Sequence, residues 1–384
     1  MFLGIVFTVC GSVVSTDDTA LWLAHLRSFP EDPYAEVPAS TFRYRRSGGF
    51  ETVLDAVSID DLPDRPGALD PYLQSDVQVD YDDTARGTYD SGSERIGSRM
   101  SVGVDLRKRF YGRTGKTGEL MLQAYLVQAD DLMDPLLLFH EVEDWEVQWN
   151  DTNYNHAALP DDLMNIRVGH FDLPFGLEPT IDEQGSLRQF LHESNFGFRE
   201  DWGITVNGGD GELSYEAGWT RGTGNDFRTT GDPGLVSGRV GAKPARNVQA
   251  GVSFLEGRTM NYVGPDRTTE IVDRQRVGVD FQIHHRGFAL LTEASMGSDE
   301  NENVHHRLVE LNWSPAYDET LTWLQFRNQA RQTTGWDDFL AASLGIETPI
   351  PGGWLFSAEW TQELDAFETE SRIGYLSMQL RMLF

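Results

Sequence analysis

Charged side chains occupy every second position in several segments of the chain. In the clearest example, Arg276 and Asp280 share one face of an extended segment, whereas Val277, Val279 and Phe281 share the other. Rows of carboxylates and guanidinium groups that face water attract, repel or bind dissolved ions. These rows of charged residues therefore indicate an interaction with dissolved ions.

Motifs for catalysis or metal binding are missing from the sequence. It contains no GxSxG, HExxH or P-loop pattern. The pairs His284-His285 and His305-His306 lack the spacing of metal ligands with an acidic partner. Cys10 is the one cysteine, which excludes a disulfide framework, a haem-attachment motif and a thiolate metal cluster. We therefore expect no enzymatic activity, no cofactor and no metal.

The overall charge argues against a nucleic-acid partner. The 384 residues include 31 Lys and Arg against 61 Asp and Glu, which gives a formal net charge of −30 at pH 7. A chain of this charge repels phosphate groups. No apolar run reaches the roughly 18 residues that a membrane helix requires.

The first 75 residues differ from the rest. Residues 2–9 form a short apolar run before small residues, which predicts a secretory signal over residues 1–15. Because the run has no basic residues before it, we expect this signal to be truncated; the alternative is a buried N-terminal strand. We expect residues 16–75 to form a segment of unknown fold that lies on the periplasmic side of residues 76–384 or inside the structure that they form.

Residues 76–384 consist of segments that alternate apolar and polar residues with period two, which predicts an all-β chain. Short turns such as 285–287 and 314–318 alternate with longer polar connections at 221–234, 257–271, 297–304, 330–337 and 363–371. This pattern is typical of a transmembrane antiparallel β-barrel with short periplasmic turns and long extracellular loops. We predict about sixteen strands, with fourteen or eighteen as alternatives. The segment 150–163 is too long for a short turn.

The final strand and one internal motif carry a family resemblance. Residues 374–384 alternate up to a terminal aromatic, Phe384, and resemble the last strand of bacterial outer-membrane barrels. Residues 166–178, IRVGHFDLPFGLE, resemble a strand and Pro-Phe-Gly turn of the phosphate-selective (OprO/OprP-like) porins. The resemblance implies a porin in the Gram-negative outer membrane, surrounded by lipid, and it is compatible with a homotrimer, the form that many porins take. It also implies recognition of Phe384 by the barrel-assembly machinery.

The resemblance further implies that the loop at about 174–200 folds inward and narrows a channel. The candidate pore-lining or constriction residues are Arg107, Arg167, Glu178, Asp182, Glu183, Arg188, Arg199, Glu216, Arg239, Arg276, Asp280, Glu293, Arg327 and Arg381. The chain departs from the phosphate-selective pattern because lysine occurs at three positions, 108, 116 and 243. We therefore expect passive diffusion of small hydrophilic solutes, with at most a weak preference for cations.

Two other functions remain open at this point. A barrel of this kind could serve as a structural sheath or export conduit, with residues 16–75 contacting a periplasmic partner. A membrane-embedded hydrolase is the third alternative, because some outer-membrane barrels use Ser, His and acidic side chains at one rim.

Overall fold

The computed structural model describes residues 75–89, 96–112, 115–130, 142–159, 163–181, 186–210, 212–225, 231–245, 247–260, 271–300, 302–314, 320–332, 336–351, 354–366 and 374–383. All of them belong to one compact unit. The predicted signal, the segment before β1, Asp182, Glu183 and Phe384 lie outside the described residues, as does the side chain of Arg107.

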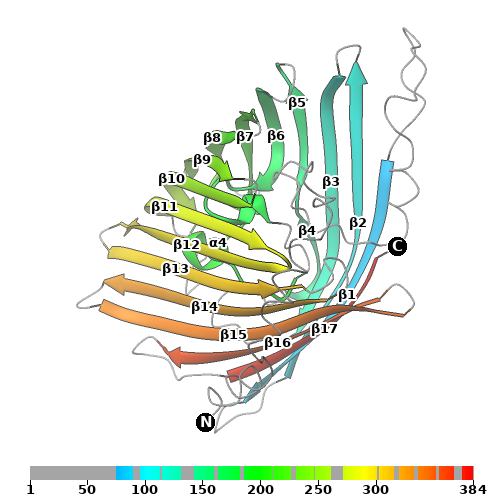
Figure 1. Cartoon of the computed structure of the whole chain (residues 1–384), viewed down its shortest axis with the longest axis vertical. Helices are drawn as coiled ribbons and strands as arrows, with labels where there is room; N and C mark the ends of the chain where they lie inside the picture. The colour runs from blue at the N-terminus through cyan, green and yellow to red at the C-terminus, as the bar shows by residue number, and fades with distance from the viewer. Residues whose placement is uncertain are drawn as a thin grey trace, which may run out of the picture. The chain divides into compact units, whose positions relative to one another are not determined.

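Antiparallel strands make up nearly all of this unit (Figure 1). They are β1 (Ser75–Tyr89), β2 (Ile96–Gly112), β3 (Gly115–Asp130), β4 (Val142–Trp149), β5 (Thr152–Ala157), β6 (Asn165–Asp172), β7 (Glu200–Gly209), β8 (Leu213–Thr220), β9 (Gly234–Ala245), β10 (Val248–Met260), β11 (Ile271–His285), β12 (Phe288–Asp299), β13 (Glu302–Trp313), β14 (Leu321–Gln332), β15 (Trp336–Ile350), β16 (Trp354–Asp365) and β17 (Gly374–Leu383). Among the described residues, no helix is long and apolar enough to cross a bilayer.

The strands pair in sequence order and the pairing returns to its start. From β5 onward each strand pairs with the next, and β17 pairs with β1, with Asp80 opposite Leu383 and Tyr89 opposite Gly374. β4 and β5 both pair with β3, at different levels, so together they fill one place in the ring. The prediction of an antiparallel barrel of about sixteen strands is therefore confirmed.

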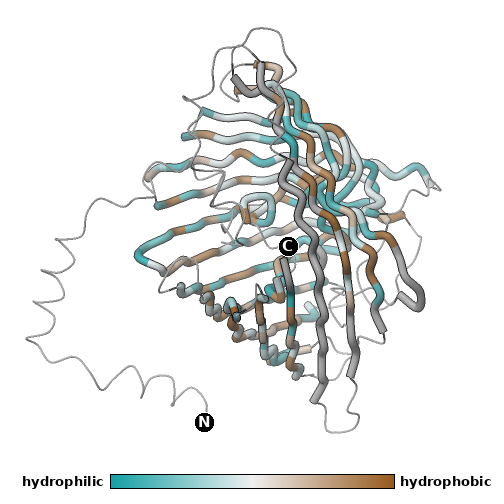
Figure 2. The backbone as a smooth tube through the Cα atoms, turned by 90° about the vertical axis from the view of Figure 1, so that its right-hand side faces the viewer, coloured by the Kyte–Doolittle hydropathy of each residue, from teal (hydrophilic) through white to brown (hydrophobic). Residues whose placement is uncertain are grey.

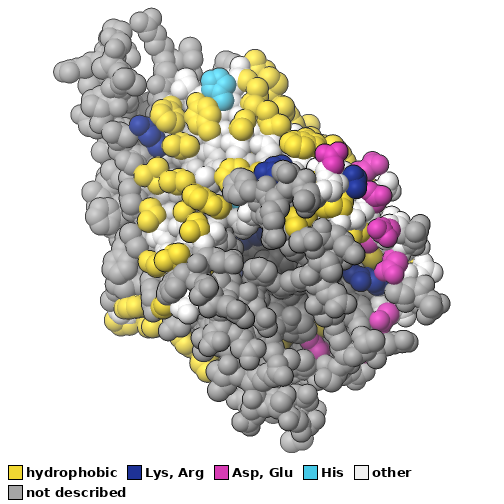
Figure 3. All heavy atoms as spheres, turned by 180° about the vertical axis from the view of Figure 1, so that it is seen from behind, with side chains coloured by type: hydrophobic (Ala, Val, Ile, Leu, Met, Phe, Trp, Pro, Cys, Tyr) yellow, Lys and Arg dark blue, Asp and Glu magenta, His cyan; other side chains and the backbone are white. Residues whose placement is uncertain are grey.

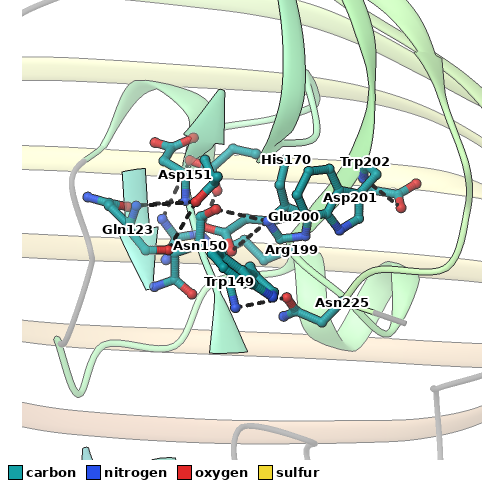
Figure 4. Close-up of polar contacts among 12 residues, drawn as sticks. Gln123, Trp149, Asn150, Asp151, His170, Arg199, Glu200, Asp201, Trp202 and Asn225 are labelled. Carbon is teal, nitrogen blue, oxygen red and sulfur yellow. Dashed lines mark hydrogen bonds and ion pairs between the residues drawn. The ribbon is translucent and has the colours of Figure 1, made fainter. Parts of the chain in front are cut away.

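A short break separates β4 from β5 (Figure 4). Gln123 on β3 bridges it: the backbone N–H of Asp151 donates to the side-chain Oε1 of Gln123 at 3.1 Å, and Thr152 Oγ1 donates to the backbone carbonyl of Gln123 at 3.1 Å. The expectation that 150–163 is a long connection was wrong, because residues 152–157 continue the strand. The strand was hard to detect in the sequence because it is short and its period is interrupted at the break.

Hydrophilic and hydrophobic residues alternate along the strands (Figure 2). The two kinds lie on opposite faces of the sheet: on β11, Val277 and Val279 are 55% and 56% exposed, whereas Arg276 and Asp280 are buried. Similar exposed apolar residues recur on the other strands, including Val252, Phe254, Val309, Leu311, Phe326, Leu344 and Met378. On the face that Figure 3 shows, hydrophobic side chains gather over part of the described surface. Most of the apolar residues therefore point outward, and most of the charged residues point inward.

Two of the predicted long connections are tight in the structure. β12 ends at Asp299 and β13 begins at Glu302, while β14 ends at Gln332 and β15 begins at Trp336. The described residues of these two segments, 297–300, 302–304, 330–332 and 336–337, are mostly polar, but most of their backbone continues the strand ladder, because backbone pairing does not require apolar side chains. The connection after Trp313 is instead longer than predicted, since β14 begins at Leu321. At 221–233 and 261–270 the longer connections occur where they were expected.

The outward face gives a direct test of the membrane placement. Val279 lies in the middle of β11, next to Val252 on β10 and Ala294 on β12. We expect Val279→Arg to lower the free energy of unfolding by about 2–4 kcal/mol, because a guanidinium in hydrocarbon is costly. The measurement is a denaturant titration in lipid vesicles. Val279→Phe is the control and should stay near the wild-type value; equal stability of the arginine variant would contradict the placement.

Candidate functional site

The longest described connection, between β6 and β7, lies against the inner face of the ring (Figure 1). It covers residues 173–199 and contains the 3-10 helix η4 (Glu178–Thr180) and the short helix α4 (His192–Phe196). We call it the inner loop. Leu187, near its middle, packs on Leu321 and Trp323 of β14. In the order of pairing, β14 stands halfway round the ring from β6. The inner loop therefore reaches the opposite wall.

The Pro-Phe-Gly turn fixes the beginning of the inner loop to the wall. The backbone N–H of Gly176 donates to Ser253 Oγ at 3.0 Å, and that of Leu177 donates to Glu293 Oε2 at 2.8 Å. Gly176 has φ 57°, a conformation that glycine adopts without strain. The Phe175 ring lies on Gly278, where an added Cβ would come 2.7 Å from the ring. The motif is therefore built for contact with β10, β11 and β12.

A buried ion pair joins the two helices of the inner loop. His192 Nδ1 contacts Glu178 Oε2, and the backbone N–H of His192 donates to Glu178 Oε1 at 3.0 Å. The other ring nitrogen, Nε2, lies 2.7 Å from the carbonyl oxygen of Phe175. Both ring nitrogens thus lie next to oxygen atoms. This contact closes the loop on itself.

Apolar clusters fill the space between the inner loop and the wall. Phe175 and Phe196 pack edge to face, with ring centroids 5.0 Å apart, and contact Leu255 of β10. A second cluster joins Leu177 and Leu191 to residues of β12 and β13, namely Leu291 and Leu308. Burial of such side chains contributes about 1.5–3 kcal/mol each. The inner loop is consequently packed in the manner of a protein core.

Arginines of β11 hold the end of the inner loop. Arg276 Nε donates to Asn195 Oδ1 at 2.6 Å, and Arg274 Nη1 donates to the carbonyl of Phe196. Both guanidinium groups also pair with Asp299, at 2.7 and 2.9 Å. One carboxylate thus orients two arginines toward the backbone of α4.

Further polar contacts tie the middle of the inner loop to the wall. Arg188 Nη1 lies 3.1 Å from Glu310 Oε1, and Gln189 Nε2 donates to the Tyr375 hydroxyl at 3.1 Å. Glu310 also accepts a hydrogen bond from Gln325 Nε2 at 2.6 Å. These contacts extend to β13, β14 and β17, so they restrain the loop on the side of the ring opposite its origin.

Ion pairs also line the wall itself. Arg239 donates to both carboxylate oxygens of Asp280, at 2.6 and 2.9 Å. Arg167 pairs with Glu216, which accepts a further hydrogen bond from Thr205 at 2.6 Å. Each carboxylate is thereby fixed in one orientation.

The candidate residues fall into groups by exposure. Glu178, Arg188, Arg239, Arg276, Asp280, Glu293, Arg327 and Arg381 are buried. Arg167, Arg199 and Glu216 are partly exposed, and Arg199 pairs with Asp172 at 2.8 Å. Most of the buried members contact the inner loop or pair across strands. Among the described residues, no group of three His, Cys, Asp or Glu side chains could hold a metal ion.

Sequence reasoning missed several residues that anchor the inner loop, namely Ser253, Asn195, Ser295, Asp299 and Tyr375. The period-two pattern places Ser253 and Ser295 on the inner face. It does not reveal that the loop lies over them, because Gly176 and Ser253 are separated by 77 positions in the chain.

Glu293 gives a test of how the inner loop is held. Glu293→Ala leaves the buried N–H of Leu177 without an acceptor, a loss of about 1–3 kcal/mol. We expect faster trypsin cleavage after Arg188, which is buried in the folded barrel. Glu293→Gln retains an acceptor oxygen and should resist cleavage like the wild type.

The matched control is Glu347→Ala, which removes another buried carboxylate of the inner wall. Glu347 accepts a hydrogen bond from Ser357. Cleavage of the Glu347→Ala variant should stay at the wild-type rate. If Glu293→Gln is cleaved as quickly as Glu293→Ala, the hydrogen bond to Leu177 is not what holds the turn.

No protein-family model matches the sequence, and no curated protein matches it either. Solved structures do match the fold. Pseudomonas putida OprB aligns with 81% of this chain and 94% of its own, at 10% identity and a TM-score of 0.58. An anion-selective porin from Comamonas acidovorans aligns over 81% and 100%, at 9% identity and a TM-score of 0.56.

A third similar structure is the outer membrane channel DcaP of Acinetobacter baumannii. It aligns over 81% of this chain and 97% of its own, at 8% identity and a TM-score of 0.53. At identities this low, the structural likeness shows a shared architecture and nothing finer. The chain therefore has the β-barrel fold of bacterial outer-membrane porins.

Proposed function

We propose that this chain is a porin of the bacterial outer membrane, through which small hydrophilic solutes or ions diffuse passively. One observation carries the proposal: apolar side chains such as Val279 are exposed on the outside of a closed ring, whereas charged side chains such as Asp280 face inward. In water this arrangement is unfavourable. In a bilayer the outer residues contact lipid and the inner residues line a polar interior.

The inner loop is the proposed constriction. The contact of Leu187 with Trp323 supports this role, because it carries the loop from β6 to the far wall. The ion pairs Arg188–Glu310 and His192–Glu178 support a fixed position rather than a mobile lid. A fixed loop narrows the passage to the same width in every molecule, which suits diffusion of small solutes.

We also propose that the chain is related to the phosphate-selective porins in particular. This part of the proposal rests on the Pro174-Phe175-Gly176 turn. The chain differs from that pattern in its scarcity of lysine. Arg239 and Arg167 are also neutralised by adjacent carboxylates. We therefore propose a general pore with a weak cation preference, in contrast to the Comamonas neighbour described as anion-selective.

Several further roles complete the proposal. Residues 1–15 act as the export signal, and residues 16–75 act at the periplasmic side or within the barrel. Phe384 serves as the assembly signal, and the barrel contacts outer-membrane lipid and forms a homotrimer. A trimeric form of Vibrio cholerae OmpT, at 12% identity and a TM-score of 0.52, supports the last point by analogy of fold.

Planar-bilayer recording of the purified protein tests the function. We expect stable stepwise conductance, and a reversal potential in a KCl gradient displaced slightly toward the potassium potential, because the net charge is −30. A barrel that conducts no current would instead favour the structural sheath or export conduit. Strong anion selectivity would contradict the weak cation preference and leave the porin function intact.

A further inference from the structure

A hollow opens on the outer surface of the barrel over β10, β11 and β12, which lie side by side (Figure 1). Its volume is about 290 Å³, and its lining includes the exposed side chains of Phe254, Val277 and Met296. Glu256 and Gln275 also line it, and Gln275 Nε2 donates to Glu256 Oε1 at 3.2 Å. The hollow therefore has an apolar part and a polar part.

The outward face of the strands changes from apolar to polar near this hollow. Toward the rim that carries the connection 261–270, the change comes at Gln275 on β11. On β13 it comes at Arg307, the outward residue that follows Val309 toward the same rim. Beyond Arg307, the ring of His305 lies next to that of Trp336, with centroids 4.7 Å apart. Because aromatic residues gather at membrane interfaces, Arg307 lies where hydrocarbon meets the lipid headgroups.

Arg307 stands at the edge of the hollow and has no acidic partner. Met296 on β12 lies opposite His305 on β13, so Met296 and Arg307 are diagonal neighbours, within reach of a long side chain. Arg307 is exposed. Among the described residues, no carboxylate pairs with its guanidinium, and the outward faces of β12, β13 and β14 carry no Asp or Glu. The charge of Arg307 is therefore open to an anion at the membrane surface.

The order of these groups is that of an amphiphile. A phosphorylated lipid carries its negative phosphate directly beside its acyl chains. A guanidinium binds phosphate with two parallel N–H groups, and the apolar part of the hollow suits a stretch of one chain. Glu256 lies three strands from Arg307 and repels an anion, which places the phosphate on the β13 side. Exposed apolar side chains such as Val252 and Leu344 lie on either side, so lipid surrounds the site.

We propose that this surface binds one phosphorylated lipid of the leaflet at this rim, which is the extracellular leaflet when the longer loops face outward. The phosphate lies on Arg307, and part of an acyl chain lies in the hollow. The inference rests on the proposed contact of the barrel with outer-membrane lipid and adds the lipid class and the place. It does not depend on the passage of solutes. A lipid held in this way stays with the barrel when detergent replaces the bilayer.

Native mass spectrometry of the purified barrel in a neutral detergent tests the site. Phosphatidic acid is the probe, and diacylglycerol, which has the same chains without the phosphate, is its counterpart. We expect the barrel to retain one phosphatidic acid, to bind diacylglycerol more weakly, and not to bind inorganic phosphate. In Arg307→Gln the apparent dissociation constant of phosphatidic acid should rise about fivefold, whereas that of diacylglycerol should not change.

A second variant tests the hollow. Val277→Trp fills it with an indole ring and keeps the outer face apolar, so it should weaken the binding of both lipids. The matched controls leave the site intact. Arg286→Gln removes an exposed arginine from the turn between β11 and β12 at the opposite rim, and Leu344→Trp adds the same ring to the outward face of β15. Both controls should bind phosphatidic acid like the wild type.

Three results would overturn the proposal. The first is equal binding of phosphatidic acid by the wild type and Arg307→Gln. The second is equal retention of phosphatidic acid and diacylglycerol by the wild type, a comparison that needs no variant to fold. The third is a changed oligomeric state in Arg307→Gln with unchanged lipid binding, which would assign this surface to a contact between copies of the chain.

The lipid measurement is independent of the porin function. A barrel that retains phosphatidic acid but carries no current in planar bilayers keeps the site and loses the proposed function. A barrel that conducts normally but retains no phosphatidic acid keeps the function and loses the site.

Discussion

The antiparallel pairing of β17 with β1 is the contact on which the other features depend. In the proposed membrane setting, a sheet with free edges would expose unpaired N–H and C=O groups to hydrocarbon, and each such group costs several kcal/mol. The register from Asp80 opposite Leu383 to Tyr89 opposite Gly374 removes both edges. Once the ring is closed, the alternation of side chains along each strand separates two environments. The same rule that exposes Val279 then buries Asp280.

This inversion moves the apolar core of the protein to an unusual place. Most apolar side chains of the wall strands point to the outer surface, so few of them point into the interior of the barrel. The inner loop supplies them: Phe175, Phe196 and Leu191 pack on Leu255 and the neighbouring wall. Glycines at the contact, such as Gly278 beneath Phe175, let rings approach the wall. The loop therefore stabilises the barrel and occupies its interior with the same contacts.

The strands could be predicted from the sequence because their period is local. Alternation identified β11 and β17 and the direction in which Val277 and Arg276 point. The alternation pattern failed where polar residues are paired as part of a strand. The residues around Asp299 read as a loop although their backbone continues β12, and the short β5 was hidden by the break at Asn150. Local pattern cannot report hydrogen bonding to another strand.

The inner loop illustrates the second limit of sequence reasoning. The Pro-Phe-Gly motif and the charges after it marked the loop, but its partners come from distant positions, such as Glu293 for Leu177 and Asp299 for Arg276. A single sequence contains no record of which strand faces which loop. The charged residues could be predicted, whereas their pairing became visible with the fold.

That pairing changes what the charges do. Arg239 and Asp280 form two hydrogen bonds, so at a distance they act as a small dipole rather than as two charges. Asp299 likewise serves two guanidinium groups at once. A sum of acidic and basic residues along the inner wall therefore overstates the field that a passing ion meets. Selectivity depends on the charges that are not paired in this way, and the pairing is one reason why the expected cation preference is weak.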